Sequence, residues 1–200
     1  MQITVLKQQL KNPERVSVFV DNKYAFSLSL DELVSEKLIN NQELSATQLK
    51  RLKKLSADGK LKNRALAWLL NRPHSERELR DYLRRKKAEQ DLSDKLVKEL
   101  TKKGYLDDHQ YASWLTELRS RGGKSNRAIR SELYQKGISR EMIDEVLMAG
   151  GDETERLVAL IAKKRKLPRY KNDELKLAKY LTSQGFSYQL VKETLKLHKP

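Results

Sequence analysis

The chain contains no cysteine, and among its 200 residues there are only 4 prolines and 8 glycines. The missing cysteines exclude disulfide bonds and thiolate metal ligands, and they are compatible with a reducing compartment. The scarcity of proline and glycine leaves room for long uninterrupted helices. No hydrophobic run approaches the roughly 18 residues that a membrane-spanning helix needs, and the first residues lack the basic and apolar segments of a secretory signal. We therefore expect a cytoplasmic protein without a membrane span.

Positive charge is in excess, with 42 lysines and arginines against 27 aspartates and glutamates, which gives a formal net charge of +15. The excess is unevenly distributed: residues 1–60 carry +3, residues 61–106 carry +6, residues 107–151 are neutral and residues 152–200 carry +6. An excess of this size points to an anionic partner, either nucleic acid or an acidic protein. The alternative is a set of lysine-rich faces that interact only with water.

The N-terminal part of the chain predicts a small β-structure. Residues 16–20 are β-branched and aromatic, and residues 24–28 alternate between apolar and small or polar side chains. Residues 21–23 between them tolerate the positive φ angles of a tight turn, so we expect a β-hairpin. Residues 3–6 predict a third strand, with a turn at residues 11–13.

Helical patterns follow the strands. Residues 30–38 predict one helix, and Ser45 is expected to begin another. We expect this second helix to end at Asp58 and Gly59, because glycine is a common helix terminator. Residues 1–60 are thus predicted to form an N-terminal hairpin and helical extension, which structurally caps the segment that follows.

From residue 61 onward the predicted helices repeat themselves. Three residues that can cap a helix, Ser75, Ser125 and Asp173, are each followed four and eight positions later by apolar residues. These apolar residues are Leu79 and Leu83, Ile129 and Leu133, and Leu177 and Leu181. Ser75 also has Glu78 three residues on, which predicts a capping box.

Two further positions recur. Twelve residues after the cap, Gly137 and Gly185 predict left-handed helix ends, whereas Lys87 occupies that position in the first copy. Fourteen residues after the cap, Ser139 and Ser187 predict the start of another helix. The first copy has its serine four positions later, at Ser93, so we expect a four-residue insertion there.

These repeats define the predicted fold class. We expect a mainly α protein with three tandem three-helix repeats at residues 61–105, 107–149 and 152–197. Repeats of this size bury their faces against their neighbours and form elongated arrays. The extension of residues 1–60 precedes the array.

No catalytic, metal or cofactor site is predicted. The histidines His74, His109 and His198 are isolated and lack metal-ligand spacing. Asp107 and Asp108 form a carboxylate pair, which we interpret as a helix cap rather than a metal or acid–base site. There is neither a phosphate-binding loop nor a dinucleotide-binding motif. We expect a protein that is not an enzyme; the enzymatic alternative is a metal-dependent nuclease.

Basic residues recur at equivalent helix positions. Arg77 and Arg80 lie two and five positions after the first cap, and Arg127 and Arg130 have the same offsets in the second copy, away from the apolar stripe. Arginine binds phosphates and carboxylates with bidentate geometry. The candidate partner- or DNA-binding residues are Arg77, Arg80, Arg84, Arg85, Lys86, Arg119, Arg121, Lys124, Arg127, Arg130, Lys163, Lys164, Arg165 and Lys166. The alternative is an ordinary solvated face, neutralised by neighbouring carboxylates.

Three stretches of the sequence resemble the RecX family of recombination regulators. They are residues 67–79 (AWLLNRPHSEREL), residues 104–112 (GYLDDHQYA) together with Trp114, and residues 129–138 (IRSELYQKGI). In this order and spacing the motifs are specific to the family, and the resemblance covers roughly residues 60–197. It implies the fold of three tandem three-helix repeats, and the N-terminal strands resemble an extension seen in some members. Lys87 and the expected insertion after it depart from the pattern.

The resemblance also implies a function. RecX proteins modulate the bacterial recombinase RecA: they bind its filament on single-stranded DNA and typically restrain filament growth, ATP hydrolysis, strand exchange and co-protease activity. Such a protein acts in DNA recombination, DNA repair and the SOS response. We expect a monomer whose partners are the RecA filament and, through non-specific contacts, single-stranded DNA. The rival interpretation is a DNA-binding architectural protein with no recombinase partner.

Overall fold

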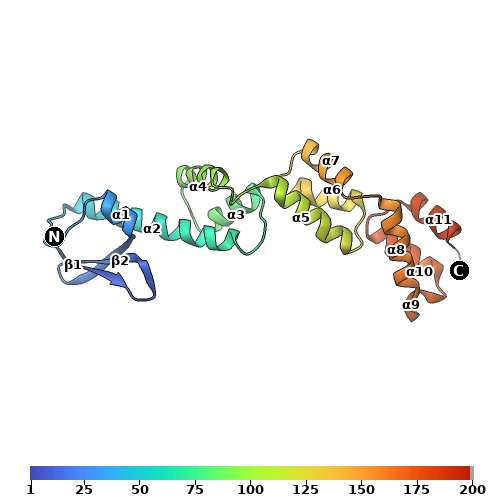
Figure 1. The fold of residues 1–200 in the computed structure, drawn as a ribbon, viewed down its shortest axis with the longest axis horizontal. Helices are drawn as coiled ribbons and strands as arrows, with labels where there is room; N and C mark the ends of the chain where they lie inside the picture. The colour runs from blue at the N-terminus through green and yellow to red at the C-terminus, as the bar shows by residue number, and fades with distance from the viewer. Residues whose placement is uncertain (199–200) are drawn as a thin grey trace.

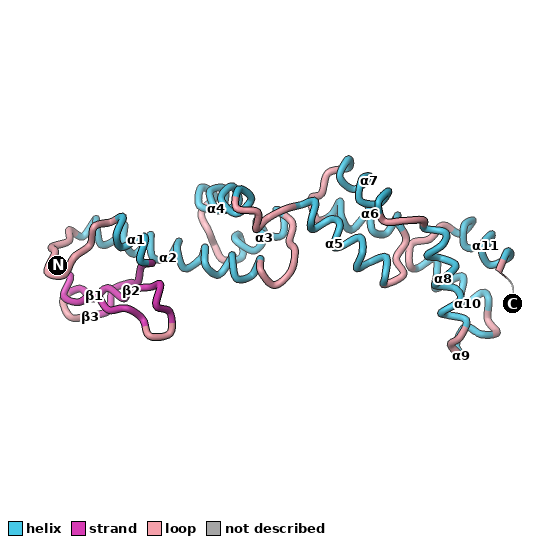
Figure 2. The backbone as a smooth tube through the Cα atoms, in the orientation of Figure 1, coloured by secondary structure: helices cyan, strands magenta, loops and turns pink. Residues whose placement is uncertain are grey.

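The computed structural model describes residues 1–198, which form a row of small units with the N-terminus at one end and the C-terminus near the other (Figure 1). Strands occur in the first unit, and the units after it are built from helices (Figure 2). Each unit has its own hydrophobic cluster of buried residues. The predicted elongated, mainly α array is therefore confirmed.

The first unit contains an antiparallel sheet in the order β1 (Ile3–Gln9), β2 (Asn12–Val20) and β3 (Lys23–Ser29). The predicted hairpin and third strand are confirmed. Asp21 and Asn22 form the β2–β3 turn with positive φ angles of 49° and 64°. Positive φ angles at both central residues match the right-handed twist of the two flanking strands.

The turn between the first two strands lies earlier than predicted. Gln9 pairs with Asn12 across the hairpin, so that the turn consists of residues 10–11. Pro13 lies inside β2 rather than in the turn predicted at residues 11–13. This is near the start of the strand, where a missing N–H is tolerated.

Helix α1 (Leu30–Ser35) is followed by α2 (Ala46–Leu69), a helix of 24 residues that continues through Gly59. The predicted helix end at Asp58 and Gly59 is therefore wrong. Gly59 is buried against α1, where a Cβ atom would overlap the carboxylate of Glu32. That carboxylate accepts a hydrogen bond from the backbone N–H of Ser29. The glycine thus leaves room for the Glu32 side chain of α1 against α2.

The continuous α2 links the first unit to the helical array. Its N-terminal half contributes Leu52 to the core beneath the sheet, and its C-terminal half contributes Ala65 and Leu69 to the next core. The predicted boundary between residues 60 and 61 therefore falls inside a helix. The two units share one rigid element rather than a linker.

The helical array consists of three repeats. The C-terminal half of α2, α3 (Glu76–Arg85) and α4 (Gln90–Lys102) form the first repeat. The second repeat contains α5 (Asp108–Arg121), α6 (Asn126–Gln135) and α7 (Arg140–Ala149). The third contains α8 (Glu153–Arg165), α10 (Glu174–Ser183) and α11 (Tyr188–Leu197), with the short α9 (Pro168–Lys171) inserted after α8.

The predicted caps and apolar stripes are confirmed. Ser75, Ser125 and Asp173 are the N-caps of α3, α6 and α10, and each side chain accepts a backbone N–H bond from the first turn. The stripes that follow these caps are fully buried in the three repeat cores; they are Leu79, Leu83, Ile129, Leu133, Leu177 and Leu181. The same local pattern therefore builds the second helix of every repeat.

The expected four-residue insertion in the first repeat is wrong. The N-cap of α4 is Glu89, fourteen residues after Ser75, the same offset as in the other repeats. Ser93 lies inside α4 and is buried. Glu89 makes no side-chain capping bond, and glutamate is not one of the residue types that commonly cap a helix, so the prediction missed this helix start. Lys87 takes the left-handed conformation of the equivalent glycines, with a φ of 58°.

Candidate partner-binding surface

Consecutive repeats dock through a contact that occurs twice. At the first joint, Ser75 Oγ donates to the backbone carbonyl of Lys136 at 2.9 Å, and Glu76 N donates to Asp108 Oδ1 at 2.7 Å. The cap of α3 therefore meets both the C-terminal end of α6 and the N-terminal turn of α5. Asp107, beside Asp108, is the N-cap of α5, so that both carboxylates have structural partners. Burial raises the pKa of Asp108.

The second joint uses the equivalent residues of the next two repeats, although here the serine donates through its backbone N–H rather than its hydroxyl. Ser125 N donates to the backbone carbonyl of Gln184 at 3.1 Å, and Asn126 N donates to Glu153 Oε1 at 2.6 Å. Gly185 closes this joint, because a Cβ atom there would lie 2.8 Å from Ala128 Cβ. In both joints, therefore, the start of one repeat's second helix docks on the end of the next repeat's second helix and on a carboxylate at the start of its first helix.

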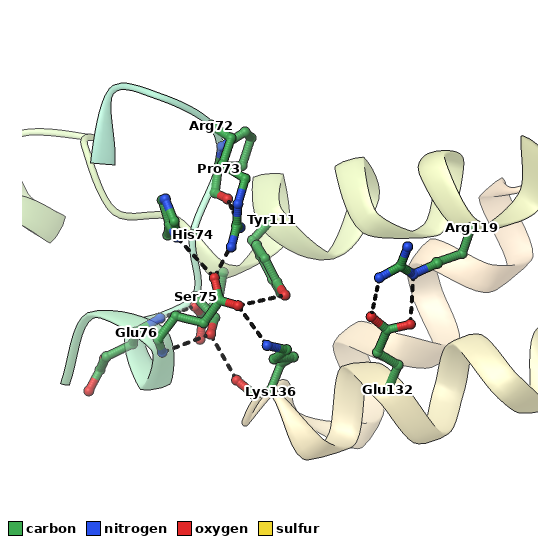
Figure 3. Close-up of polar contacts among 11 residues, drawn as sticks. Arg72, Pro73, His74, Ser75, Glu76, Tyr111, Arg119, Glu132 and Lys136 are labelled. Carbon is green, nitrogen blue, oxygen red and sulfur yellow. Dashed lines mark hydrogen bonds and ion pairs between the residues drawn. The ribbon is translucent and has the colours of Figure 1, made fainter. Parts of the chain in front are cut away.

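The first joint also contains a buried ionic cluster around Glu78. Figure 3 labels the residues that surround it, Arg72, His74, Tyr111 and Lys136. The Glu78 carboxylate lies 2.7 Å from Lys136 Nζ, 3.0 Å from Arg72 Nη1 and 2.9 Å from His74 Nδ1. The hydroxyl of Tyr111 donates to it at 3.5 Å. Burial raises the pKa of Glu78, but the hydrogen bonds from Lys136, Arg72 and His74 outweigh it and lower the pKa to about 2. The carboxylate is therefore ionised and ties the two repeats together.

This cluster corrects the predicted capping box. Ser75 Oγ accepts the hydrogen bond from Glu78 N at 3.2 Å, as expected. The Glu78 side chain does not complete the box, because it turns toward Lys136 in the second repeat. Glu78, predicted to cap its own helix, therefore stabilises the joint between two repeats.

Aromatic rings enclose the cluster on one side. The centroid of the buried His74 ring lies 3.5 Å from that of Trp68. The Trp68 ring stacks on Tyr82, with 4.8 Å between the ring centroids. The guanidinium of Arg72 lies over Trp114 at 5.2 Å. Burial lowers the pKa of His74, so the ring is neutral and its Nδ1–H donates to the carboxylate. Histidine therefore contributes a hydrogen bond here rather than a charge.

The arginines predicted from the repeat lie on the second helices as expected. Arg80 pairs with Glu76 at 2.7 Å and with Asp94 at 2.6 Å. Arg130 pairs with Asp144. Hydrogen bonds from Arg80 lower the pKa of the exposed Asp94. At each of these positions an arginine of the second helix reaches a carboxylate of the third helix.

Other candidates on α3 face solvent. Arg84 is paired with Asp81 at 2.7 Å yet its side chain is 80% exposed. Arg77, Arg85 and Lys86 are exposed. They have no carboxylate within ion-pair distance in the part of the chain that the structure describes. Arg127 has the same exposed position on α6. Arg77, Arg85, Lys86 and Arg127 are therefore accessible to an external anion.

A second group of candidates lines one cleft at the joint between the second and third repeats. Arg121, Lys163 and Lys164 border this basic cleft of about 370 Å³, together with Arg156 and Tyr180. Lys164 Nζ lies 4.5 Å from the Tyr180 ring, and Arg121 also pairs with Glu117. Arg156 donates to Ser120 Oγ at 3.0 Å. The basic cleft combines cations from two repeats with an aromatic ring.

The remaining candidates have other surroundings. Arg119 forms a bidentate pair with Glu132 at 2.8 and 2.6 Å, which occupies its guanidinium within the second repeat. Arg165 donates to the carbonyl of His198 within the third repeat. Lys124 is half-buried and Lys166 is exposed. The structure thus divides the fourteen candidates between exposed cations, the basic cleft and internal ties.

Several residues of the joints were missed from the sequence. Arg72, Tyr111 and Lys136 surround Glu78, and Arg156 lines the basic cleft. Arg72 lies in the family-like stretch 67–79, Tyr111 in 104–112 and Lys136 in 129–138. Those stretches were therefore the available signal, but the sequence does not show that they converge.

The described residues hold no group of three or more histidine, cysteine or carboxylate side chains arranged to bind a metal. Within residues 1–198, none of the helices combines the length and apolar character needed to cross a membrane.

The fold and the site define a class: an elongated array of three-helix repeats with a β-sheet unit at its start and cations along its surface. Three family descriptions match the chain, "Regulatory protein RecX N-terminal domain" over residues 1–45, "RecX, first three-helix domain" over 62–100 and "RecX, second three-helix domain" over 107–147. The chain belongs to the RecX family of regulatory proteins.

Relatives and solved structures agree with this assignment. A "Regulatory protein RecX" of Clostridium botulinum (strain Eklund 17B) is 32% identical over 97% of this chain and 94% of its own. That of Listeria monocytogenes serovar 1/2a is 31% identical over 96% of this chain and 74% of its own. A "Crystal structure of regulatory protein RecX" superposes with a TM-score of 0.72 at 25% identity, covering 98% of both chains. RecX from Lactobacillus salivarius superposes with a TM-score of 0.57 at 23% identity, over 70% of this chain and 94% of that one.

Proposed function

We propose that the chain binds the filament that RecA forms on single-stranded DNA and restrains its growth, ATP hydrolysis, strand exchange and co-protease activity. Family membership supports a regulatory role. The observation that carries the proposal is the recurrence of exposed cations, Arg77 and Arg127, at equivalent positions of two docked repeats. A filament presents the same surface on each subunit, so equivalent cations can contact equivalent anionic groups on successive subunits.

The primary test is the DNA-dependent ATPase rate of RecA with and without the chain. At a stoichiometric ratio we expect the rate to fall, because a bound array that bridges subunits restrains filament growth. An unchanged rate would overturn the proposal.

The role of the repeated arginines is tested by replacing Arg77, Arg80, Arg127 and Arg130 with alanine. The matched control replaces four exposed lysines of the N-terminal unit and α2 (Lys7, Lys11, Lys23 and Lys50), which removes the same charge. We expect the arginine variant to inhibit RecA less than the control, with the largest difference at low salt, since screening weakens charge contacts. Equal inhibition by both variants across a salt series would contradict the assignment.

The rival function is non-specific DNA binding without a recombinase partner, and the basic cleft supports it because lysine, arginine and tyrosine suit a phosphate backbone and its bases. Binding of the chain to a RecA–DNA filament and to bare single-stranded DNA at equal salt separates the two. Tighter binding to the filament supports the RecA role, and equal or weaker binding supports the rival.

We further propose that the chain acts as a cytoplasmic monomer, by binding rather than by catalysis. A net charge of +15 opposes self-association at low salt, and RecX proteins form a regulatory family. Sedimentation analysis tests the monomer, and incubation with DNA and Mg²⁺ tests for nuclease activity. Cleavage of DNA by the purified chain would refute the non-catalytic role.

A further inference from the structure

A groove runs between the second and third helices of a repeat, and it can be compared across the array because its lining positions are equivalent. In the first repeat Arg80 of α3 and Asp94 of α4 pair across it, with 2.6 Å between Nη1 and Oδ1. In the second repeat Arg130 of α6 and Asp144 of α7 do the same. Each pair lies five and nineteen residues after the cap of its second helix. An ion pair thus spans the groove in two repeats.

The third repeat lacks this ion pair. The equivalent positions hold Ala178 on α10 and Lys192 on α11, which cannot form an ion pair with one another. In the part of the chain that the structure describes, no carboxylate lies within ion-pair distance of Lys192. The groove has a volume of about 250 Å³, and the equivalent groove of the second repeat, which an ion pair spans, has a volume of about 540 Å³. The absence of the ion pair therefore changes the chemistry of the lining rather than the size of the groove.

The lining of the third repeat's groove is also apolar at positions where the first two repeats have polar residues. Leu175 occupies the position that Arg77 and Arg127 hold in the other repeats, and it is 78% exposed. Tyr188 stands where they have Gln90 and Arg140, and it is 68% exposed. Exposed apolar side chains beside a concavity are typical of binding sites. We refer to this feature, lined by Leu175, Ala178, Tyr188, Lys192, Leu195 and Lys196, as the third groove.

The third groove has a basic rim. Lys192 and Lys196 border it from α11, and the one lining carboxylate, that of Glu174, lies 3.6 Å from Arg165. An occupant therefore needs apolar side chains for the floor and carboxylates for the rim. A second copy of this chain is a poor occupant, since two molecules of net charge +15 repel each other.

The secondary structure selects the form of the occupant. The third groove lies between two helices whose backbone groups are hydrogen-bonded within each helix, so no strand edge is available for an added β-strand. A groove of this kind receives the side chains of one face of a helix. We propose that the third groove binds an acidic amphipathic helix of a partner protein, with its apolar face toward Leu175 and Tyr188. This binding site is separate from the repeated arginines and does not depend on the proposed RecA role.

The test uses fluorescence anisotropy with a labelled synthetic helix of about sixteen residues, with leucines spaced for one face and glutamates flanking them. A scrambled peptide of the same composition measures attraction by charge alone. We expect the helical peptide to bind the full chain at least about ten-fold more tightly than the scrambled one.

The decisive variant transfers the ion pair of the other repeats to the third groove: Ala178→Arg together with Lys192→Asp. It places charge on the apolar lining and removes one cation of the basic rim. It lowers the net charge by one, as does the control Lys171→Ala, which changes an exposed lysine of the same repeat outside the groove. Circular dichroism melting confirms that both variants are folded. We expect the double variant to bind the helical peptide at least about ten-fold more weakly and the control to bind within about two-fold of the parent. Equal binding of the two peptides by the parent, or unchanged binding by the folded double variant, would overturn the proposal.

Discussion

The carboxylate of Glu78 in the first repeat lies 2.7 Å from the ammonium group of Lys136 in the second. The two residues are 58 positions apart, and the contact forms because the cap of α3 docks on the C-terminal end of α6. Glu78 is 11% exposed, so its charge is compensated inside the joint rather than by water. Removing that charge has consequences for the whole array.

Glu78→Gln is expected to destabilise the folded chain by about 2 kcal/mol, because Lys136 and Arg72 lose the carboxylate that compensates them. Urea unfolding followed by circular dichroism measures the change. Glu14→Gln is the control, since Glu14 is exposed on the N-terminal sheet. A variant as stable as this control would show that the cluster adds nothing to the joint.

The same carboxylate predicts how stability depends on pH. Its pKa is about 2 in the folded chain and 4.5 ordinarily. A lowered folded pKa contributes stability above pH 4.5, and the contribution is lost as the pH falls through that value toward 2. The difference in urea midpoint between the parent and Glu78→Gln should therefore be largest near neutral pH and shrink in acid. A difference that grows in acid would contradict the ionised state of Glu78.

Lys87→Gly is expected to stabilise the chain by about 1 kcal/mol, because Lys87 has a φ of 58°, a conformation that costs a side chain more than glycine. Lys86→Gly removes the same charge at a residue with a φ of −84°, so it should be neutral or destabilising. Thermal unfolding of both variants distinguishes the effect of conformation from that of charge. Equal shifts in melting temperature would argue against the strained turn.

Gly59→Ala tests the close approach of α1 and α2. In the interior of a helix alanine is favoured over glycine by about 1 kcal/mol, but here its Cβ would displace the Glu32 carboxylate from its capping bond. We expect the substitution to stabilise a Glu32→Ala background and to lose that gain in the parent. A double-mutant cycle by urea unfolding measures the coupling. Additive effects would mean that the two helices are not in contact at this point.

Lys163→Ala combined with Lys164→Ala is expected to weaken binding to bare single-stranded DNA, since both cations line the basic cleft. Each lost phosphate contact should reduce the slope of log affinity against log salt by about 0.7. Fluorescence anisotropy across a salt series measures the slope, with Lys50→Ala and Lys53→Ala on α2 as the charge-matched control. The same loss of slope in both variants would leave the cleft with no special role.

The repeat architecture was predictable because it depends on residues that are close to one another in the sequence. The caps Ser75, Ser125 and Asp173 and the apolar stripes after them act within one or two turns of helix, where spacing determines the structure. Where a distant residue determines the outcome, sequence reasoning failed. Gly59 looked like a terminator because Glu32, which explains it, lies on another helix.

The site was predicted only as a set of residue types. Arginines at matching offsets identified the positions of Arg80 and Arg130, but not the aspartates of the neighbouring helix that pair with them. The basic cleft combines Arg121 with Lys163 and Lys164 from the next repeat, and this meeting depends on how the repeats dock. In the sequence, Arg121 is separated from the two lysines by α6, α7 and most of α8.

The recurrent joints make the array directional. In each joint the earlier repeat supplies the start of its second helix, through Ser75 or Ser125, and the later repeat supplies a helix end and a carboxylate. The two ends of the array are therefore different surfaces, and turning it end for end does not superpose one repeat's contacts on another's. If more than one repeat binds a polymer that has its own polarity, such as a nucleic acid strand, the array binds it in one orientation.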